Sequence, residues 1–217
     1  MRAVFTLLIT LCSFAGYSQK FMLGVQGGML YNTAPIGSSE YFTSFESKPQ
    51  MIVGGKLGID TRKIQLGVGC NVSGVDYIRE ETIPAVFSIP AIIEYRYSSP
   101  VINPYLFLNI KKNLVRSFLY FGINAGFARF NSGKDEVYAA GVPFDYAGVN
   151  GTIPSAGLQA GARIKLMDGM GISAEAAMRY TSAAPGMHVH KPDYSGLENY
   201  KGGIFSFPLT LGVDYIF

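Results

Sequence analysis

The chain has 217 residues, enough for one ordinary domain, and only 15% of them are charged, against about 25% in a typical soluble domain. It contains 26 Gly, 14 Tyr and 15 Phe but no Trp, and 48% of its residues are hydrophobic, which argues against disorder. The formal net charge of +3 is too small to suggest nucleic-acid binding, and two cysteines are too few for a disulfide scaffold or a multi-cysteine zinc site.

The first 18 residues have the layout of a secretory signal peptide. A short positive start leads into an apolar stretch at 3–14, and small residues then precede Gln19. We expect cleavage after Ser18 and a mature domain that covers 19–217. A membrane anchor is the alternative, but the apolar stretch is shorter than the roughly 20 residues that a spanning helix needs. The sequence therefore predicts an exported protein.

Lipid attachment at Cys12 would require a small residue directly before it, and Leu11 stands there instead. Cleavage of the signal peptide would leave Cys70 as the one cysteine of the mature chain, so we expect no internal disulfide. Cys70 falls on an apolar strand face, where we interpret it as a small hydrophobic residue.

Beyond the signal peptide, apolar residues alternate with small or polar ones, which is typical of β-strands that have two different faces. The C-terminal segment shows this alternation most clearly. One of its faces carries the large apolar residues Phe205, Phe207, Leu209, Leu211, Val213, Tyr215 and Phe217. The other face carries Ser206, Pro208, Thr210, Gly212 and Asp214. Seven further segments alternate in the same way, so we predict eight strands: 21–31, 51–59, 64–72, 87–96, 119–127, 153–166, 172–180 and 205–217.

The composition of the two strand faces predicts a barrel. The polar faces are mostly glycine with single charges, which suits the narrow interior of an eight-stranded barrel. The apolar faces are continuous and end in Tyr or Phe. This is what a lipid-facing surface with a belt of aromatic residues at the membrane interface requires. Because backbone groups in hydrocarbon must all be paired, such a sheet has to close. We therefore predict an all-β fold, an eight-stranded antiparallel up-and-down transmembrane β-barrel.

The predicted connections alternate in length, as they do in barrels with short periplasmic turns and longer outer loops. The short ones fall at 60–63 and 167–169 and the longer ones at 32–48, 77–82, 131–152 and 183–203. With an even number of strands, we expect both termini on the periplasmic side.

Residues 98–113 depart from this scheme because they are too many for an ordinary turn, and 105–110 is apolar. A further strand here would make nine and place the C-terminus on the wrong side. We interpret the segment as an elaborated turn at the inner membrane interface, with Lys111 and Lys112 as charges at the membrane edge.

The chain ends in Val213-Asp214-Tyr215-Ile216-Phe217, with a terminal Phe, an aromatic residue two positions earlier and alternating hydrophobic residues before it. This ending resembles the C-terminal signature of Gram-negative outer-membrane barrels. Together with 89–97 and 120–126, it makes nearly all of 20–217 similar to the PorT-like family of small β-barrels, which is akin in fold to OmpA and OmpX. The resemblance implies a place in the cell outer membrane and recognition of Val213, Tyr215 and Phe217 by the barrel-assembly machinery. It implies hardly anything about activity.

Eight charged residues fall on the predicted interior face: Lys56, Glu94, Arg96, Arg163, Lys165, Glu175, Arg179 and Asp214. Charges in a dry interior are costly unless they are paired. We interpret the set as a polar network of ion pairs that fills the barrel, because eight strands leave little room. A narrow gated conduit or a proton path is the alternative.

Both histidines lie in one predicted outer loop, as His188 and His190, and Asp193 and Ser195 follow them. Two imidazoles and a carboxylate suit zinc or another divalent metal, and a His/Asp/Ser trio suits acyl transfer. These residue types in one loop are a weak signal, since catalytic triads are defined by geometry. The general character of loops favours a polar surface loop over both. We therefore predict no catalytic residues, no metal site and no cofactor.

The sequence favours a non-enzymatic outer-membrane protein, a structural or interaction barrel or an accessory subunit of a secretion-type envelope machine. A lipid A-modifying enzyme that uses the loop of His188 and Asp193 is one alternative, and a small pore is another. The expected partners are outer-membrane lipid, the barrel-assembly machinery and an envelope protein, with no nucleic acid.

Overall fold

The computed structural model describes residues 19–36, 43–83, 91–131, 134–139, 142–146, 150–183, 187–190, 197–199 and 202–217. The signal peptide predicted at 1–18 lies outside the described residues. In the described part of the chain, no helix is long and apolar enough to cross a membrane. The strands there are β1 (Lys20–Asn32), β2 (Ser44–Ser47), β3 (Gln50–Asp60), β4 (Ile64–Ile83), β5 (Ala91–Asn113), β6 (Ser117–Phe130), β7 (Lys134–Ala139), β8 (Val142–Tyr146), β9 (Gly151–Lys165), β10 (Met170–Thr181), β11 (His188–His190), β12 (Leu197–Asn199) and β13 (Ile204–Ile216).

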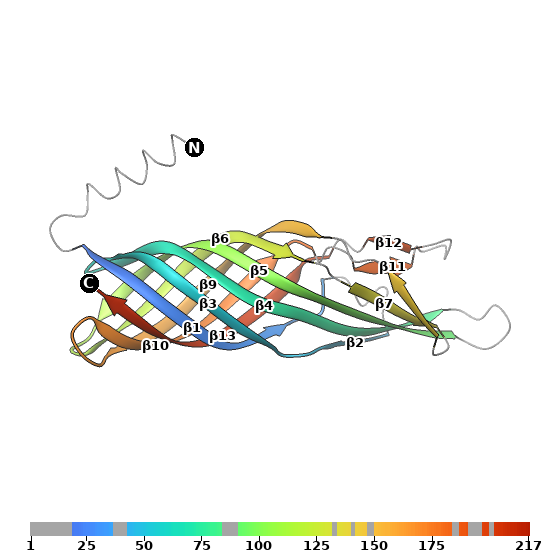
Figure 1. Ribbon diagram of the computed structural model, residues 1–217, viewed down its shortest axis with the longest axis horizontal. Helices are drawn as coiled ribbons and strands as arrows, with labels where there is room; N and C mark the ends of the chain where they lie inside the picture. Colours follow the sequence, from blue (N-terminus) through green and yellow to red (C-terminus); the bar gives the residue numbers. More distant parts are fainter. Residues whose placement is uncertain are drawn as a thin grey trace, which may run out of the picture.

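Eight of these strands close into one ring, in the order β1, β3, β4, β5, β6, β9, β10, β13 and back to β1 (Figure 1). Every neighbouring pair in the ring is antiparallel. The first and last strands close it, in register from Met22 opposite Ile216 to Asn32 opposite Ser206. Closure leaves no open sheet edge in the ring, so its backbone groups can pair without water. The predicted eight-stranded antiparallel up-and-down barrel is confirmed.

The three short turns of the ring lie at the end where both termini emerge. They cover 61–63, 114–116 and 166–169. At this end the Phe217 amide donates to the Phe21 carbonyl at 2.9 Å. We call it the short-turn end. The opposite end, where the chain makes its longer connections, is the loop end (Figure 1).

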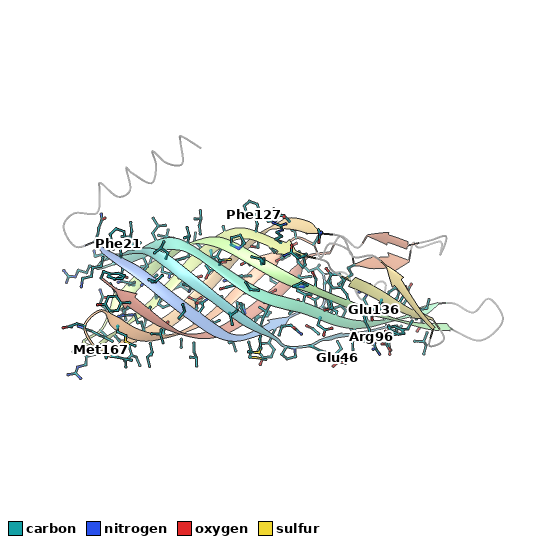
Figure 2. All side chains as sticks on the ribbon, in the orientation of Figure 1. Phe21, Glu46, Arg96, Phe127, Glu136 and Met167 are labelled. Carbon is teal, nitrogen blue, oxygen red and sulfur yellow. The ribbon has the colours of Figure 1, made fainter. Side chains whose placement is uncertain are left out.

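Large apolar side chains cover the outer surface of the ring. On β6, Leu119, Phe121, Ile123 and Phe127 point outward with about half of each side chain exposed. The same alternation runs round the ring, from Phe21 on β1 to the outward face of β13, and Figure 2 shows these side chains projecting from the ribbon. The opposite positions hold mostly glycine and polar residues, together with a buried cluster of Met22, Tyr105, Phe107, Phe118, Tyr120 and Ile216. The ring is therefore apolar outside and largely polar inside, the reverse of a soluble sandwich.

The strands β4 and β5 are much longer than predicted, and this corrects two expectations. β4 continues through the predicted loop 77–82, and β5 runs unbroken through 98–113, which we had interpreted as an elaborated turn. The two strands pair residue by residue from Ile64 opposite Ile110 to Ile83 opposite Ala91. The apolar stretch at 105–110 is therefore the ring-forming part of β5, and the strand count stays at eight.

Beyond the ring, β4 and β5 form an extension in which β2 pairs with β4, and β7 pairs with both β5 and β8 (Figure 1). Here most inward side chains are apolar or aromatic, and most outward ones are polar. The buried cluster at this end contains Val75, Tyr77, Ile93, Tyr95, Tyr97, Val101, Ala128, Phe130, Val137, Met187 and Ile204. The polarity of the two faces thus reverses along β4 and β5, as expected where a strand leaves lipid for water.

Candidate functional site

The interior of the ring carries a network of polar side chains to which all eight strands contribute. Alternate side chains of each strand point inward, so a polar residue at one of these positions places its polar group in the interior. Its members include Gln26, Lys56, Gln65, Asn71, Asn103, Asn109, Tyr120, Asn124, Gln159, Arg163, Glu175, Arg179 and Asp214.

Glu175 on β10 holds the centre of this network. Its Oε2 accepts from Lys56 Nζ at 2.5 Å and from Tyr120 Oη at 2.9 Å. The side chains of Lys56 and Glu175 are only 12% and 6% exposed, so the pair lies inside the barrel. Lys56 Nζ also lies 5.7 Å from the centre of the Phe107 ring. The buried Lys56 ammonium and Glu175 carboxylate thus neutralise each other, and the Tyr120 hydroxyl adds a hydrogen bond to the carboxylate.

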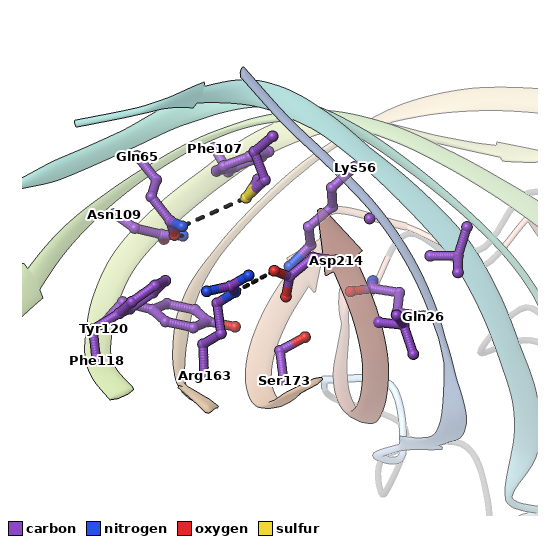
Figure 3. A pocket seen from close by; sticks show the side chains of 14 residues that line it. Gln26, Lys56, Gln65, Phe107, Asn109, Phe118, Tyr120, Arg163, Ser173 and Asp214 are labelled. Carbon is purple, nitrogen blue, oxygen red and sulfur yellow. Dashed lines mark hydrogen bonds and ion pairs between the residues drawn. The ribbon is translucent and has the colours of Figure 1, made fainter. Parts of the chain in front are cut away.

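A second ion pair lies nearer the short-turn end, between Arg163 Nε and the Asp214 carboxylate (Figure 3). Both side chains are more than nine-tenths buried. Arg163 Nη2 donates in addition to the Gly169 carbonyl at 2.9 Å. Gly169 has a φ of 78°, a left-handed conformation that glycine adopts without strain in the β9–β10 turn. The pair therefore ties the wall of the barrel to the β9–β10 turn.

Four amide side chains form a continuous chain across the interior. Asn124 Nδ2 donates to Gln159 Oε1 at 3.0 Å, and Gln159 Nε2 donates to Asn109 Oδ1 at 2.8 Å. Asn109 Nδ2 donates in turn to Gln65 Oε1 at 3.3 Å. All four side chains are buried, and they come from β6, β9, β5 and β4. These four residues were not predicted, because the expected interior network was built from charged residues alone. Asn and Gln at inward positions were the signal that could have identified them.

Arg179 on β10 occupies the part of the interior nearer the loop end. Its Nη1 donates to Asn103 Oδ1 at 3.0 Å, and its guanidinium lies 4.5 Å from the centre of the Tyr105 ring. With the Asn71 amide oxygen turned toward it, Arg179 Nη1 and Nη2 also donate to that oxygen at 2.8 and 2.9 Å. This charge is therefore held by amide oxygens and an aromatic face.

Asn103 also replaces a backbone hydrogen bond that is missing between β5 and β6. Pro104 has no N–H to donate across to β6, and Asn103 Nδ2 donates to the Phe127 carbonyl there at 2.9 Å. The same nitrogen donates to Ser155 Oγ at 2.9 Å.

Lys111 belongs to the interior set as well, which corrects its predicted place at the membrane edge. Its Nζ donates to both carboxylate oxygens of Asp60, at 2.6 and 2.7 Å, and its side chain is 3% exposed. Its neighbour Lys112 points outward and is exposed. The alternation of β5 separates the two lysines to opposite faces.

Three of the eight predicted interior charges lie elsewhere, and for them the prediction is wrong. Glu94 and Arg96 pair with each other on the outward side of the extension, where the Arg96 side chain is 51% exposed. The structure buries Ile93 and Tyr95 instead, because the odd-numbered residues of β5 point inward along the whole strand and are apolar in the extension. Lys165 stands at the end of β9, half exposed, and its Nζ contacts Asp168 at 2.7 Å. This hydrogen bond holds the pKa of the exposed Asp168 carboxyl below its ordinary value.

A buried charged group that sequence reasoning missed lies in the extension. Arg79 is fully buried, with its guanidinium 4.7 Å from the centre of the Tyr95 ring. Tyr95 Oη donates to Glu81 Oε2 at 2.8 Å, and Glu81 is also buried. The sequence had placed Arg79 and Glu81 in the predicted loop 77–82 and Tyr95 on a lipid-facing strand face.

The predicted loop site and the C-terminal signature fall in different parts of the structure. His188 and His190 belong to β11, which pairs with β12 as a separate hairpin, and Asp193 and Ser195 lie outside the described residues. Among the described residues, no three His, Cys, Asp or Glu gather closely enough to hold a metal ion.

The signature residues Val213, Tyr215 and Phe217 all point outward from the last strand. Their exposed fractions are 42%, 44% and 65%.

The side chains leave little space inside the barrel. One cavity, lined by Lys56, Tyr120, Arg163 and Asp214 among others, has a volume of about 30 Å³ (Figure 3). The other, lined by Asn71, Asn103 and Arg179 among others, has about 40 Å³. Such volumes hold one or a few water molecules. A wider space of about 430 Å³ lies at the short-turn end, between Lys20, Asp60 and Lys165.

No protein-family model matches the chain, and no curated protein matches it. Among solved structures, Neisserial surface protein A (NspA) is similar, with 11% identity and a TM-score of 0.50 over 91% of this chain and 97% of that chain. The fold is that of the eight-stranded outer-membrane β-barrels. The outer membrane protease OmpT from Escherichia coli matches over 92% of this chain and 96% of that chain, with 12% identity and a TM-score of 0.48. The outer membrane protein OprG from Pseudomonas aeruginosa matches over 94% and 98%, with 10% identity and a TM-score of 0.45.

Proposed function

We propose that this protein is an outer-membrane barrel whose filled interior does not conduct and which acts as a structural or interaction module. Its outward belt of large apolar side chains suits lipid contact, and the exported character predicted from the N-terminal sequence agrees with this location. In this proposal the short turns and both termini face the periplasm, and the extension formed by β4 and β5 stands outside the cell.

The filled interior is the single observation that carries the non-conducting role. Two ion pairs, a chain of four amides and Arg179 cross the ring, and the cavities between them measure about 30 and 40 Å³. A hydrated ion needs a continuous path, and wide aqueous channels occur in barrels with many more strands. The interior therefore serves to hold the wall together.

Planar-bilayer recording tests this role directly. The mature protein should insert and show no steady conductance. A reproducible open level at several voltages would support a small pore and contradict the filled interior.

The resemblance to PorT-like barrels supports a more specific role, as an accessory subunit of a secretion-type envelope machine. The extension offers the surface for such a partner, with outward polar side chains over a rigid aromatic core. Pull-down from detergent extracts of the native membrane should recover one envelope protein in constant ratio. Deleting 77–97 should abolish that recovery while the barrel still assembles. Equal recovery by the shortened chain would contradict a role of the extension.

The enzymatic alternative has its own test. Replacing His188 and His190 by alanine should leave the mass spectrum of lipid A unchanged in cells that produce the protein. A changed spectrum relative to the unmodified protein would favour a lipid-modifying enzyme.

A further inference from the structure

The short-turn end carries a mostly positive surface. Its exposed basic side chains are Lys20, Arg62, Lys63, Lys112, Arg116 and Lys165, which we call the basic collar. Among the described residues, Asp168 is the one exposed acidic residue of this end, and it contacts Lys165. The acidic residues Asp60 and Asp214 are buried here, paired with Lys111 and Arg163. The collar therefore keeps most of its positive charge toward its surroundings.

The collar continues the outward apolar belt without a break. Lys112 follows Ile110 on the same face of β5, and Ile110 is 67% exposed. Lys63 stands directly before Ile64, which begins the outward apolar row of β4. In a membrane barrel, charges at the edge of the apolar belt lie at the level of the lipid head groups, and long basic side chains extend their amines toward the phosphates.

The turns between these basic residues carry exposed apolar side chains. Leu114 and Val115, next to Arg116, are 51% and 101% exposed. Leu166 and Met167, next to Lys165, are 53% and 61% exposed, and Figure 2 shows Met167 at this end of the molecule. Apolar side chains between lysines and arginines suit a lipid interface. There the apolar side chains can enter the boundary between head groups and acyl chains, and the basic side chains can contact the phosphates.

Among the described residues, the loop end mixes the two charge signs. On the outward side of the extension, Asp76 and Glu80 stand on β4, and Glu94 pairs with Arg96 on β5. Within the described part of the chain, a mostly positive rim thus distinguishes the short-turn end.

We propose that the basic collar binds the phosphates of anionic phospholipids in the leaflet around the short-turn end. This inference rests on the proposed membrane location. It adds two properties, the class of lipid that the barrel prefers and the leaflet in which that lipid lies. Each lysine or arginine near an anionic surface strengthens binding about fivefold. Three outward members of the collar therefore provide a preference that is easily measured.

Native mass spectrometry of the mature barrel, released from mixed phosphatidylglycerol and phosphatidylcholine vesicles, tests the proposal. The wild-type barrel should retain phosphatidylglycerol in preference. The variant Lys63→Gln/Lys112→Gln/Arg116→Gln should lose that preference by about tenfold or more. The matched control Lys48→Gln/Arg96→Gln/Arg129→Gln removes three exposed cations at the loop end and should behave as the wild type.

Two further measurements use the wild-type barrel alone. Raising the salt concentration should weaken the preference through screening. An excess of inorganic phosphate at constant ionic strength should not displace the lipid, whereas displacement would indicate a small phosphate site and overturn the leaflet proposal.

Equal retention of the two lipids, or equal loss in both triple variants, would also overturn it. A barrel that enters pure phosphatidylcholine vesicles but shows no lipid preference contradicts only the collar. A chain that stays soluble without lipid or detergent contradicts the membrane location itself.

Discussion

Glu175 is the carboxylate on which the centre of the barrel depends, because two buried donors converge on it. Replacing it with glutamine leaves the buried Lys56 ammonium without its nearest counter-charge. Breaking a buried ion pair by removing one partner costs about 3–5 kcal/mol. We expect Glu175→Gln to lower the free energy of unfolding by about this amount, measured by urea unfolding in lipid vesicles.

Two matched variants separate charge from packing at this position. Tyr120→Phe removes only the 2.9 Å hydrogen bond to Glu175 and should cost about 1 kcal/mol. The double variant Lys56→Met/Glu175→Gln removes both charges and should recover much of the loss. If Glu175→Gln alone unfolds at the wild-type urea concentration, the pair contributes nothing to stability.

Gly126 on β6 allows β5 to approach closely where Pro104 interrupts the hydrogen bonds. A Cβ at this position would lie 2.0 Å from the Pro104 carbonyl oxygen and 2.6 Å from the Tyr105 Cα, both backbone atoms that cannot rotate away. Gly126→Ala should therefore destabilise the barrel by about 1–3 kcal/mol, as overpacking does. Urea unfolding measures it.

Gly55 provides the control for this substitution, since its nearest contact would be the Gly24 carbonyl oxygen at 3.4 Å. Gly55→Ala should leave the unfolding midpoint almost unchanged. Equal effects of the two changes would show that close approach of the strands at Gly126 is not limiting.

At the scale of elements, β4 and β5 each join a lipid-facing part to a water-facing part. The rings of Tyr77 and Tyr97 stack in the extension with centres 6.3 Å apart, and Phe45 of β2 packs on Tyr77 at 4.9 Å. Tyr97→Ala removes a fully buried ring and should loosen the extension while the ring of eight strands stays closed. Trypsin should then cut after Arg79 or Arg96, and the remaining barrel should still resist unfolding by detergent.

Ser98→Ala, on the outward side of the same strand, should leave the digestion pattern unchanged. If Tyr97→Ala instead unfolds the whole barrel, the extension and the ring form one cooperative unit.

The alternation of residue types was sufficient to predict the number of ring strands, their antiparallel order and the lipid-facing side of most of them. It failed on β5 because alternation has the same period on both sides of the membrane boundary, whereas the meaning of the apolar face reverses there. Ile93 and Tyr95 are buried in the extension, and Leu106 and Leu108 on the same strand face outward. A strand of 23 residues also exceeds the length that one membrane crossing requires. Residues 98–113 were assigned to a turn because a separate strand there would have made nine.

The interior was predicted in part. Lys56, Arg163, Glu175, Arg179 and Asp214 lie where the inward parity of their strands places them. The specific pairing of Lys56 with Glu175 could not be predicted, because it joins residues 119 positions apart across the interior. Pairing of this kind depends on the tilt and stagger of the strands, which alternation does not contain.

For the molecule as a whole, closure of β1 on β13 completes the barrel, and the residues that resemble an assembly signal lie on the closing strand. The Tyr215 and Phe217 rings pack edge to face at 4.7 Å on the outer surface. Because both rings are exposed, removing the Phe217 ring creates no cavity in the interior. Phe217→Ala should therefore leave the stability of the assembled barrel within about 0.5 kcal/mol of wild type, the usual range for surface substitutions.

The same change should lower the fraction of barrel that assembles in cells if the C-terminal residues are recognised during assembly. Phe207→Ala is the matched control, since it removes an outward Phe from the same strand at the loop end. The assembled fraction is measured by the shift in electrophoretic mobility between heated and unheated membrane samples, and stability by urea unfolding of purified barrels. Equal assembly of the two variants would contradict recognition of Phe217. A large loss of stability in Phe217→Ala would assign the Phe217 side chain to closure of the ring instead, because the substitution keeps the backbone hydrogen bond to Phe21 at the seam.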